Sequence, residues 1–116
     1  MHPAEAHRIF GDILKRTRQG AIDWRLKKES KAEPKAVDFA APATDGEHGV
    51  EIGSEHVEEH GTVYEFRVVD DAGDPLYEYA LSHHTTVEGE GGTYEQFVEL
   101  FNLARRHASA HSGRTR

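Results

Sequence analysis

The spacing of apolar residues changes twice along this chain of 116 residues. Near both ends, apolar residues recur every three to four positions, which is the period of one face of an α-helix. Between residues 22 and 83 they alternate with polar residues, which is the period of a half-buried β-strand. Helices at both ends with strands between them favour an α+β domain of two layers. We therefore expect a helix, a four- or five-stranded antiparallel sheet and a second helix, with both helices on one face of the sheet.

The opening helix is expected over residues 4–19. Pro3 suits its first turn, and Gly20 stands where a residue in the left-handed conformation ends many helices. Six residues at helical spacing form its apolar face: Ala6, Ile9, Phe10, Ile13, Leu14 and Thr17.

Five segments between the helices are expected as strands, and the clearest are residues 63–70 and 75–83. These two form a hairpin, because residues 71–74 between them are turn formers and include Gly73. Polar connections are expected over residues 27–35, 42–47 and 53–61. The apolar positions that define the five strands are Ile22, Trp24 and Leu26, then Val37 and Phe39, then Val50 and Ile52, then Tyr64, Phe66 and Val68, then Tyr77, Tyr79 and Leu81. The helices are expected to cover Trp24, Tyr64, Phe66, Val68, Tyr77, Tyr79 and Leu81.

The closing helix is expected over residues 93–109, starting with a capping box at residues 93–96. Its apolar face is expected to hold Tyr94, Phe97, Val98, Phe101, Ala104 and Ala108, flanked by Leu100. A single domain then spans residues 1–110, and residues 111–116 form a flexible basic tail.

Length and composition exclude several classes of protein. A chain of 116 residues is long enough for one domain. It has no cysteine, which excludes disulfides, thiolate zinc sites and a cysteine nucleophile. No apolar run approaches the ~18 residues of a membrane span. The first residues lack the features of a secretory signal, so we expect a cytoplasmic protein.

Charge is distributed in three blocks that together give a net charge of −7. Residues 1–36 carry nine Lys or Arg and five acids, and residues 100–116 carry four Arg and no acid. Residues 37–99 carry sixteen acids, with Arg67 as their one Lys or Arg. This asymmetry fits an acidic, solvated surface, neutralisation between the ends and the middle, or a partner steered by charge.

Three short patterns give the chain a resemblance to a known group of proteins. In residues 14–24, a helix ends in a Thr-x-x-Gly pattern before a Trp-bearing strand; residues 70–73 form a D-x-x-G turn, and residues 104–106 read Ala-Arg-Arg. This outline resembles small uncharacterised prokaryotic α+β proteins over most of the chain, although residues 27–61 depart from it in length and acidity. The resemblance implies a helix–sheet–helix fold and no activity.

The first functional interpretation is a non-catalytic interaction module. A sheet covered on one face leaves the other face and two edge strands for a protein partner, or for a second copy in a symmetric dimer. We expect no cofactor and no catalytic residue, because no phosphate loop or nucleophile motif stands in its structural context. Strand alternation predicts these residues on the open face: Glu65, Arg67, Val69, Glu78 and Ala80.

Two other functions remain open. Nucleic-acid or nucleoprotein binding would use an N-terminal cationic patch, although the sequence pI near 5.7 opposes it. Its candidate residues are Arg16, Arg18, Arg25, Lys27 and Lys28. Metal binding would use His107 and His111, which are four residues apart, or His56 and His60, which match an H-x-x-E-H pattern that chelates zinc from a helix.

Overall fold

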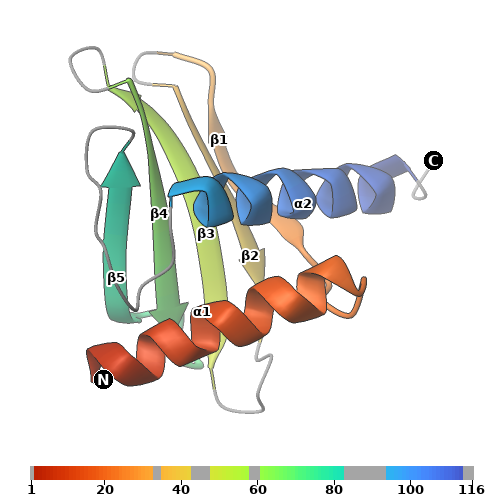
Figure 1. Ribbon diagram of the computed structural model, residues 1–116. Helices are drawn as coiled ribbons and strands as arrows, with labels where there is room; N and C mark the ends of the chain where they lie inside the picture. The colour runs from red at the N-terminus through yellow and green to blue at the C-terminus, as the bar shows by residue number, and fades with distance from the viewer. Residues whose placement is uncertain (1, 33–34, 43–47, 58–60, 83–93, 114–116) are drawn as a thin grey trace.

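The computed structural model describes residues 2–32, 35–42, 48–57, 61–82 and 94–113, with the backbone alone at 57 and 110–113. Its elements are α1 (Pro3–Arg18), β1 (Arg25–Ser30), β2 (Ala36–Ala41), β3 (Gly49–Val57), β4 (Gly61–Val69), β5 (Pro75–Ser82) and α2 (Tyr94–Gly113). Both helices cross the same face of the sheet (Figure 1). The predicted α+β architecture of two layers is therefore confirmed.

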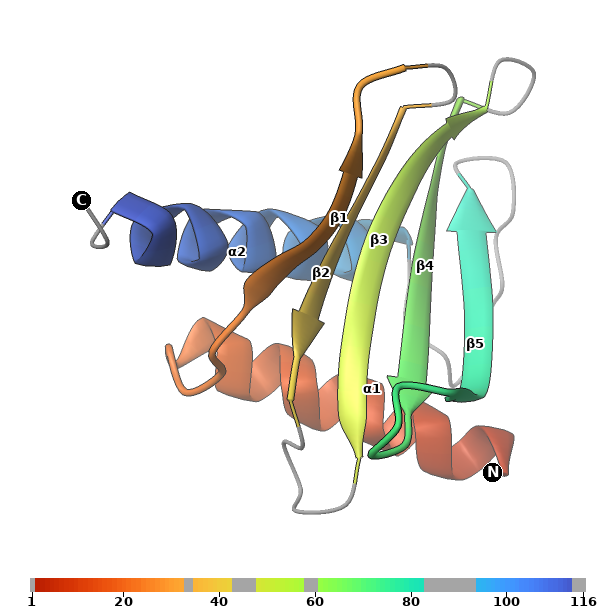
Figure 2. The ribbon, with the colours of Figure 1, turned by 180° about the vertical axis from the view of Figure 1, so that it is seen from behind.

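The sheet has the strand order β1-β2-β3-β4-β5, and every neighbouring pair is antiparallel. Each strand therefore pairs with the strand next to it in the sequence, which requires no crossover connection. Seen from behind, the second face of the sheet has none of the described helices or strands packed on it (Figure 2). This uncovered surface is called the open face below.

The helix α1 forms where the periodicity predicts it. The His2 side chain accepts a hydrogen bond from the backbone N–H of Ala4, which caps the N-terminus of the helix. At the other end Gly20 has a φ of 73°, the left-handed conformation expected of a residue that ends a helix. The predicted apolar face packs on the sheet, and its Phe10 ring contacts the rings of Phe66 and Phe97 at centroid distances of 5.0 and 4.8 Å.

The first strand lies further along the chain than predicted. Ile22 and Trp24 are buried, yet both precede β1, which begins at Arg25. The Trp24 indole N–H donates a hydrogen bond to the Thr17 hydroxyl at 3.1 Å and so holds this segment beside α1. Leu26, expected on the same strand face as Ile22 and Trp24, is 51% exposed because β1 is an edge strand.

The third strand is longer than predicted. Residues 53–57 were expected in a polar connection, but they extend β3 to Val57, and β4 begins at Gly61. Pairing with β4 explains this difference, because Ser54 stands opposite Tyr64 and continues the antiparallel ladder. The predicted turn between β4 and β5 is confirmed, with Gly73 at a φ of 85°. Its backbone is held by the Asp70 carboxylate, which accepts hydrogen bonds from the N–H groups of residues 72 and 74, both at 2.9 Å.

The helix α2 completes the core. Its buried residues are Phe97, Leu100, Phe101, Ala104 and Ala108. Leu100 is fully buried in the core cluster rather than flanking the apolar face. The helix continues to Gly113, so residues 111–113 of the predicted tail are helical; residues 114–116 and Thr93 of the predicted capping box lie outside the described residues. Neither described helix has the length and apolar character needed to cross a membrane.

Candidate functional site

The open face holds the residues that strand alternation assigned to it. Arg67 on β4 stands opposite Glu78 on β5, and Glu65 stands opposite Ala80. Glu78 and Ala80 are exposed, whereas Glu65 and Arg67 are half-buried. Val69 is only 7% exposed, so the expectation that it offers contact surface is wrong. The register of β4 and β5 shifts beside Val69, where the chain enters the turn.

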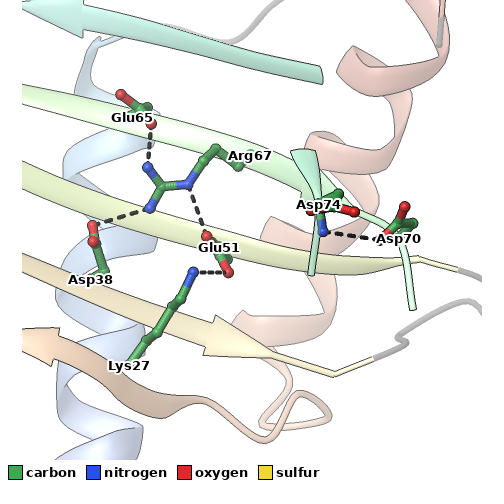
Figure 3. Close-up of polar contacts among 7 residues, drawn as sticks. All are labelled: Lys27, Asp38, Glu51, Glu65, Arg67, Asp70 and Asp74. Atoms are coloured by element: carbon green, nitrogen blue, oxygen red, sulfur yellow. Dashed lines mark hydrogen bonds and ion pairs between the residues drawn. The ribbon is translucent and has the colours of Figure 1, made fainter. Parts of the chain in front are cut away.

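Arg67 is the centre of a cluster of charged side chains (Figure 3). Its Nε donates to Glu51 at 2.8 Å, its Nη2 forms an ion pair with Asp38 at 3.2 Å, and its Nη1 donates to Glu65. The second oxygen of Glu51 accepts a hydrogen bond from Lys27 at 2.6 Å. Four strands, β1 to β4, thus contribute to one network, which we call the Arg67 cluster.

Burial and the neighbouring carboxylates have opposite effects on the pKa of Arg67. Burial by itself lowers the pKa of Arg67, but the carboxylates of Glu65, Asp38 and Glu51 outweigh it and raise that pKa. The guanidinium therefore stays charged at neutral pH. Its side chain is 18% exposed and that of Glu51 is 6% exposed. With Lys27 the cluster holds two cations and three carboxylates, a formal excess of one negative charge.

Gly53 makes the Arg67 cluster sterically possible. It lies in the middle of β3, between Asp38 on β2 and Glu65 on β4. A Cβ atom at this position would lie 1.9 Å from the Asp38 carboxylate oxygen. The absence of a side chain lets Asp38 lean across β3 to reach Arg67. Sequence reasoning missed Gly53, although a glycine inside a strand is a recognised sign of close approach.

Two hollows flank the cluster on the open face. One, of about 360 Å³, lies toward the β3–β4 end and is polar; its lining includes Lys28, Asp38, Gly53, Glu55, Val63, Glu65 and Arg67. The other, of about 600 Å³, lies toward the β4–β5 turn and has a more apolar floor; its lining includes Arg25, Ala40, Val50, Glu51, Val69, Asp70 and Asp71. The open face is therefore hollowed as well as charged.

The predicted cationic patch is divided between two surfaces. Arg16 and Arg18 lie on α1 in the helical layer, whereas Arg25, Lys27 and Lys28 lie on β1. Four of the five form ion pairs: Arg16 with Asp12 at 3.6 Å, Arg18 with Glu99 at 2.6 Å, Arg25 with Asp23 at 3.1 Å and Lys27 with Glu51 at 2.6 Å. The structure does not bring these residues together as one surface.

The predicted histidine ligands are not brought together either. His56 lies exposed on β3, so the H-x-x-E-H pattern does not begin on the helix that zinc chelation by this motif requires. His107 lies half-buried on α2; His60 and the side chain of His111 lie outside the described residues. Within the part of the chain that the structure describes, no three His, Asp or Glu residues are grouped as a metal site.

The Arg67 cluster is suited to recognition of charge and shape, since its five side chains are held in mutual ion pairs. Its carboxylates can accept further hydrogen bonds, and the hollows can admit side chains of another molecule. No family model, no curated protein and no solved structure matches this chain.

Proposed function

We propose that this chain is an interaction module that binds a protein partner through the open face of its sheet. The observation that carries this proposal is the Arg67 cluster, a fixed group of charges between two hollows on a face that no described element covers. A surface that is already ordered loses little side-chain freedom on binding, which favours affinity.

The position of the cluster supports recognition of a protein rather than of a phosphate backbone. On β2 to β5 the open face carries five carboxylates and one cation, Arg67, which is already engaged by three of them. This acidic part of the face, on β2 to β5, repels phosphates. The face also offers the exposed Ala80 and Glu78 as a rim around the more buried Glu65 and Arg67, as in many protein interfaces.

The face is a better candidate than the β1 edge of the sheet. β1 is interrupted by a bulge between Leu26 and Lys28, and its exposed side chains are mostly charged. Both features discourage the addition of another strand.

The test is affinity capture from a lysate of the source cells, with half of each sample treated with nuclease. The bait is the wild-type chain, Ala80→Arg on the open face, or Ala4→Arg on α1. The two variants introduce the same side chain at exposed alanines on opposite layers. We expect one protein to be retained by the wild type and Ala4→Arg in both halves, and lost by Ala80→Arg.

Two outcomes would contradict this proposal. Equal retention by Ala80→Arg would place the contact elsewhere on the molecule. Retention that disappears after nuclease treatment would favour nucleic-acid or nucleoprotein binding, with Arg16 and Arg18 as the first residues to substitute.

A further inference from the structure

We infer that the open face binds an extended segment of another protein with Lys or Arg at alternate positions, an inference that rests on the proposed function. The strand register places three carboxylates of this face on one diagonal line. Glu55 on β3 is paired with Val63, which lies two residues before Glu65 on β4. Glu65 is paired with Ala80, which lies two residues after Glu78 on β5. We call Glu55, Glu65 and Glu78 the carboxylate diagonal.

The spacing of the carboxylate diagonal matches that of an extended peptide. Diagonal neighbours on adjacent antiparallel strands are about 7–8 Å apart. In an extended chain every second side chain points the same way, with a repeat of about 6.5–7 Å. The flexible stem of a lysine takes up the small difference between the two spacings. A segment with cations at alternate positions can therefore place one cation beside each of the three carboxylates.

Two of the three carboxylates are free to bind a cation. Glu55 and Glu78 are exposed, and neither forms an ion pair with any residue that the structure describes. Arg67 is paired with Glu78 in the register, yet its guanidinium extends the other way, across β3 to Asp38 (Figure 3). The third carboxylate, Glu65, is 36% exposed, and Arg67 engages its Oε1 atom. Its Oε2 atom can accept a hydrogen bond from a bound cation.

The polar hollow of about 360 Å³ lies at the β3 end of the carboxylate diagonal. Glu55 and Glu65 both line it, together with the half-buried Val63. A Lys or Arg side chain can lay its apolar stem against Val63 and carry its charge to the two carboxylates. The hollow therefore gives one cation of the segment both an apolar and a charged contact.

The cations of β1 restrict where the segment can lie. Lys27 and Lys28 are exposed, and Lys28 lines the β1 side of the same hollow. A basic segment that ran over β1 would be repelled by both side chains. The segment is therefore confined to β3, β4 and β5, where its cations meet the carboxylate diagonal.

The test is an NMR titration of the ¹⁵N-labelled protein with two peptides of the same composition. One peptide alternates three lysines with threonines, and the other holds the three lysines next to one another. We expect the alternating peptide to shift amide signals of β3, β4 and β5 and to leave those of the helices in place. The contiguous peptide should bind about two- to fivefold more weakly, because only its first and third lysines face the sheet and one exposed ion pair is lost.

Substitutions on the carboxylate diagonal locate the contact. Glu55→Gln and Glu78→Gln should each raise the dissociation constant of the alternating peptide about two- to fivefold, and the two together about tenfold. The matched control is Glu29→Gln with Glu95→Gln, which removes the same charge from exposed residues. Glu29 is paired with Val37, which packs against the core on the helical side, and Glu95 lies on α2. The control should change the dissociation constant less than about twofold, since its charges lie on the other side of the sheet.

The inference is overturned if neither peptide binds, if both bind equally, or if the control weakens binding as much as the double substitution on the diagonal. Amide signals of the open face that shift with protein concentration alone would overturn it in favour of a second copy. The amide spectrum of each variant also shows whether its fold is intact.

These results are distinguishable from failure of the proposed function. A cellular protein that is lost by Ala80→Arg but retained by the double variant of Glu55 and Glu78 would keep the open face as a binding surface. It would exclude a basic segment as the occupant of that face.

Discussion

Single residues decide how the charges of the open face are arranged. Arg67 is the one Lys or Arg between residues 37 and 99, and the fold places it among three carboxylates from three strands. Gly53 contributes through its lack of a side chain, which leaves room for the Asp38 carboxylate to cross β3. Charge and the absence of a side chain are thus both needed for the cluster.

Replacing Gly53 by alanine tests this arrangement. The new Cβ would displace Asp38 from Arg67, so the free energy of unfolding should fall by about 1–2 kcal/mol. The same change in an Asp38→Ala background should cost less than half as much, because the colliding carboxylate is gone. Urea unfolding of the four proteins measures both values. Equal costs in the two backgrounds would show that Gly53 serves another purpose.

At the scale of elements, the segment between α1 and β1 determines where the sheet starts. Thr17 and Trp24 are both fully buried, and the hydrogen bond between them links the last turn of α1 to the residue before β1. A threonine on an otherwise apolar helix face is explained by this bond. Because Trp24 is fully buried, its indole N–H cannot hydrogen-bond to water and depends on the Thr17 hydroxyl as acceptor.

Thr17→Val keeps the shape of the side chain and removes the acceptor. The buried Trp24 N–H is then left unsatisfied, and the free energy of unfolding should fall by about 1–3 kcal/mol. Thr62→Val on β4 is the matched control, and since Thr62 is half-buried near the end of its strand, its effect should stay within about 0.5 kcal/mol. Urea midpoints followed by tryptophan fluorescence give the comparison. A Thr17→Val protein as stable as the control would exclude a structural role for this bond.

At the scale of the whole molecule, an ion pair connects the two helices that come from opposite ends of the chain. Arg18 at the end of α1 donates two hydrogen bonds to Glu99 of α2, both at 2.6 Å. The hydrogen bond from Arg18 lowers the pKa of Glu99. The pair is largely exposed, so solvent screening makes its contribution to stability small.

The contribution of this ion pair should depend on pH with a defined sign. Because the pKa of Glu99 is lowered in the folded state, the stabilisation is fully present above the ordinary value of 4.5 and is lost as the pH falls through the folded-state value. Glu99→Gln should therefore have a slightly lower urea midpoint than the wild type at neutral pH, and the same midpoint in acid. Glu95→Gln, an exposed residue of the same helix, is the control. A difference that persists unchanged into acid would contradict the assignment.

The sequence by itself determined the two helices, the second strand, the hairpin of β4 and β5, and the face on which Glu65, Arg67, Glu78 and Ala80 lie. These features follow from periodicity, and periodicity acts over a few neighbouring residues. It also singled out Arg67 as an isolated cation in an acidic segment.

Only the tertiary structure decided where β1 begins, how far β3 extends, and which carboxylates surround Arg67. It also separated Arg16 and Arg18 from the cations of β1 and showed the need for Gly53. Each of these outcomes depends on contacts between residues far apart in the chain, such as Trp24 with α1 or Asp38 with β4. Strand register and burial set those contacts, and the pattern of a single segment does not contain them.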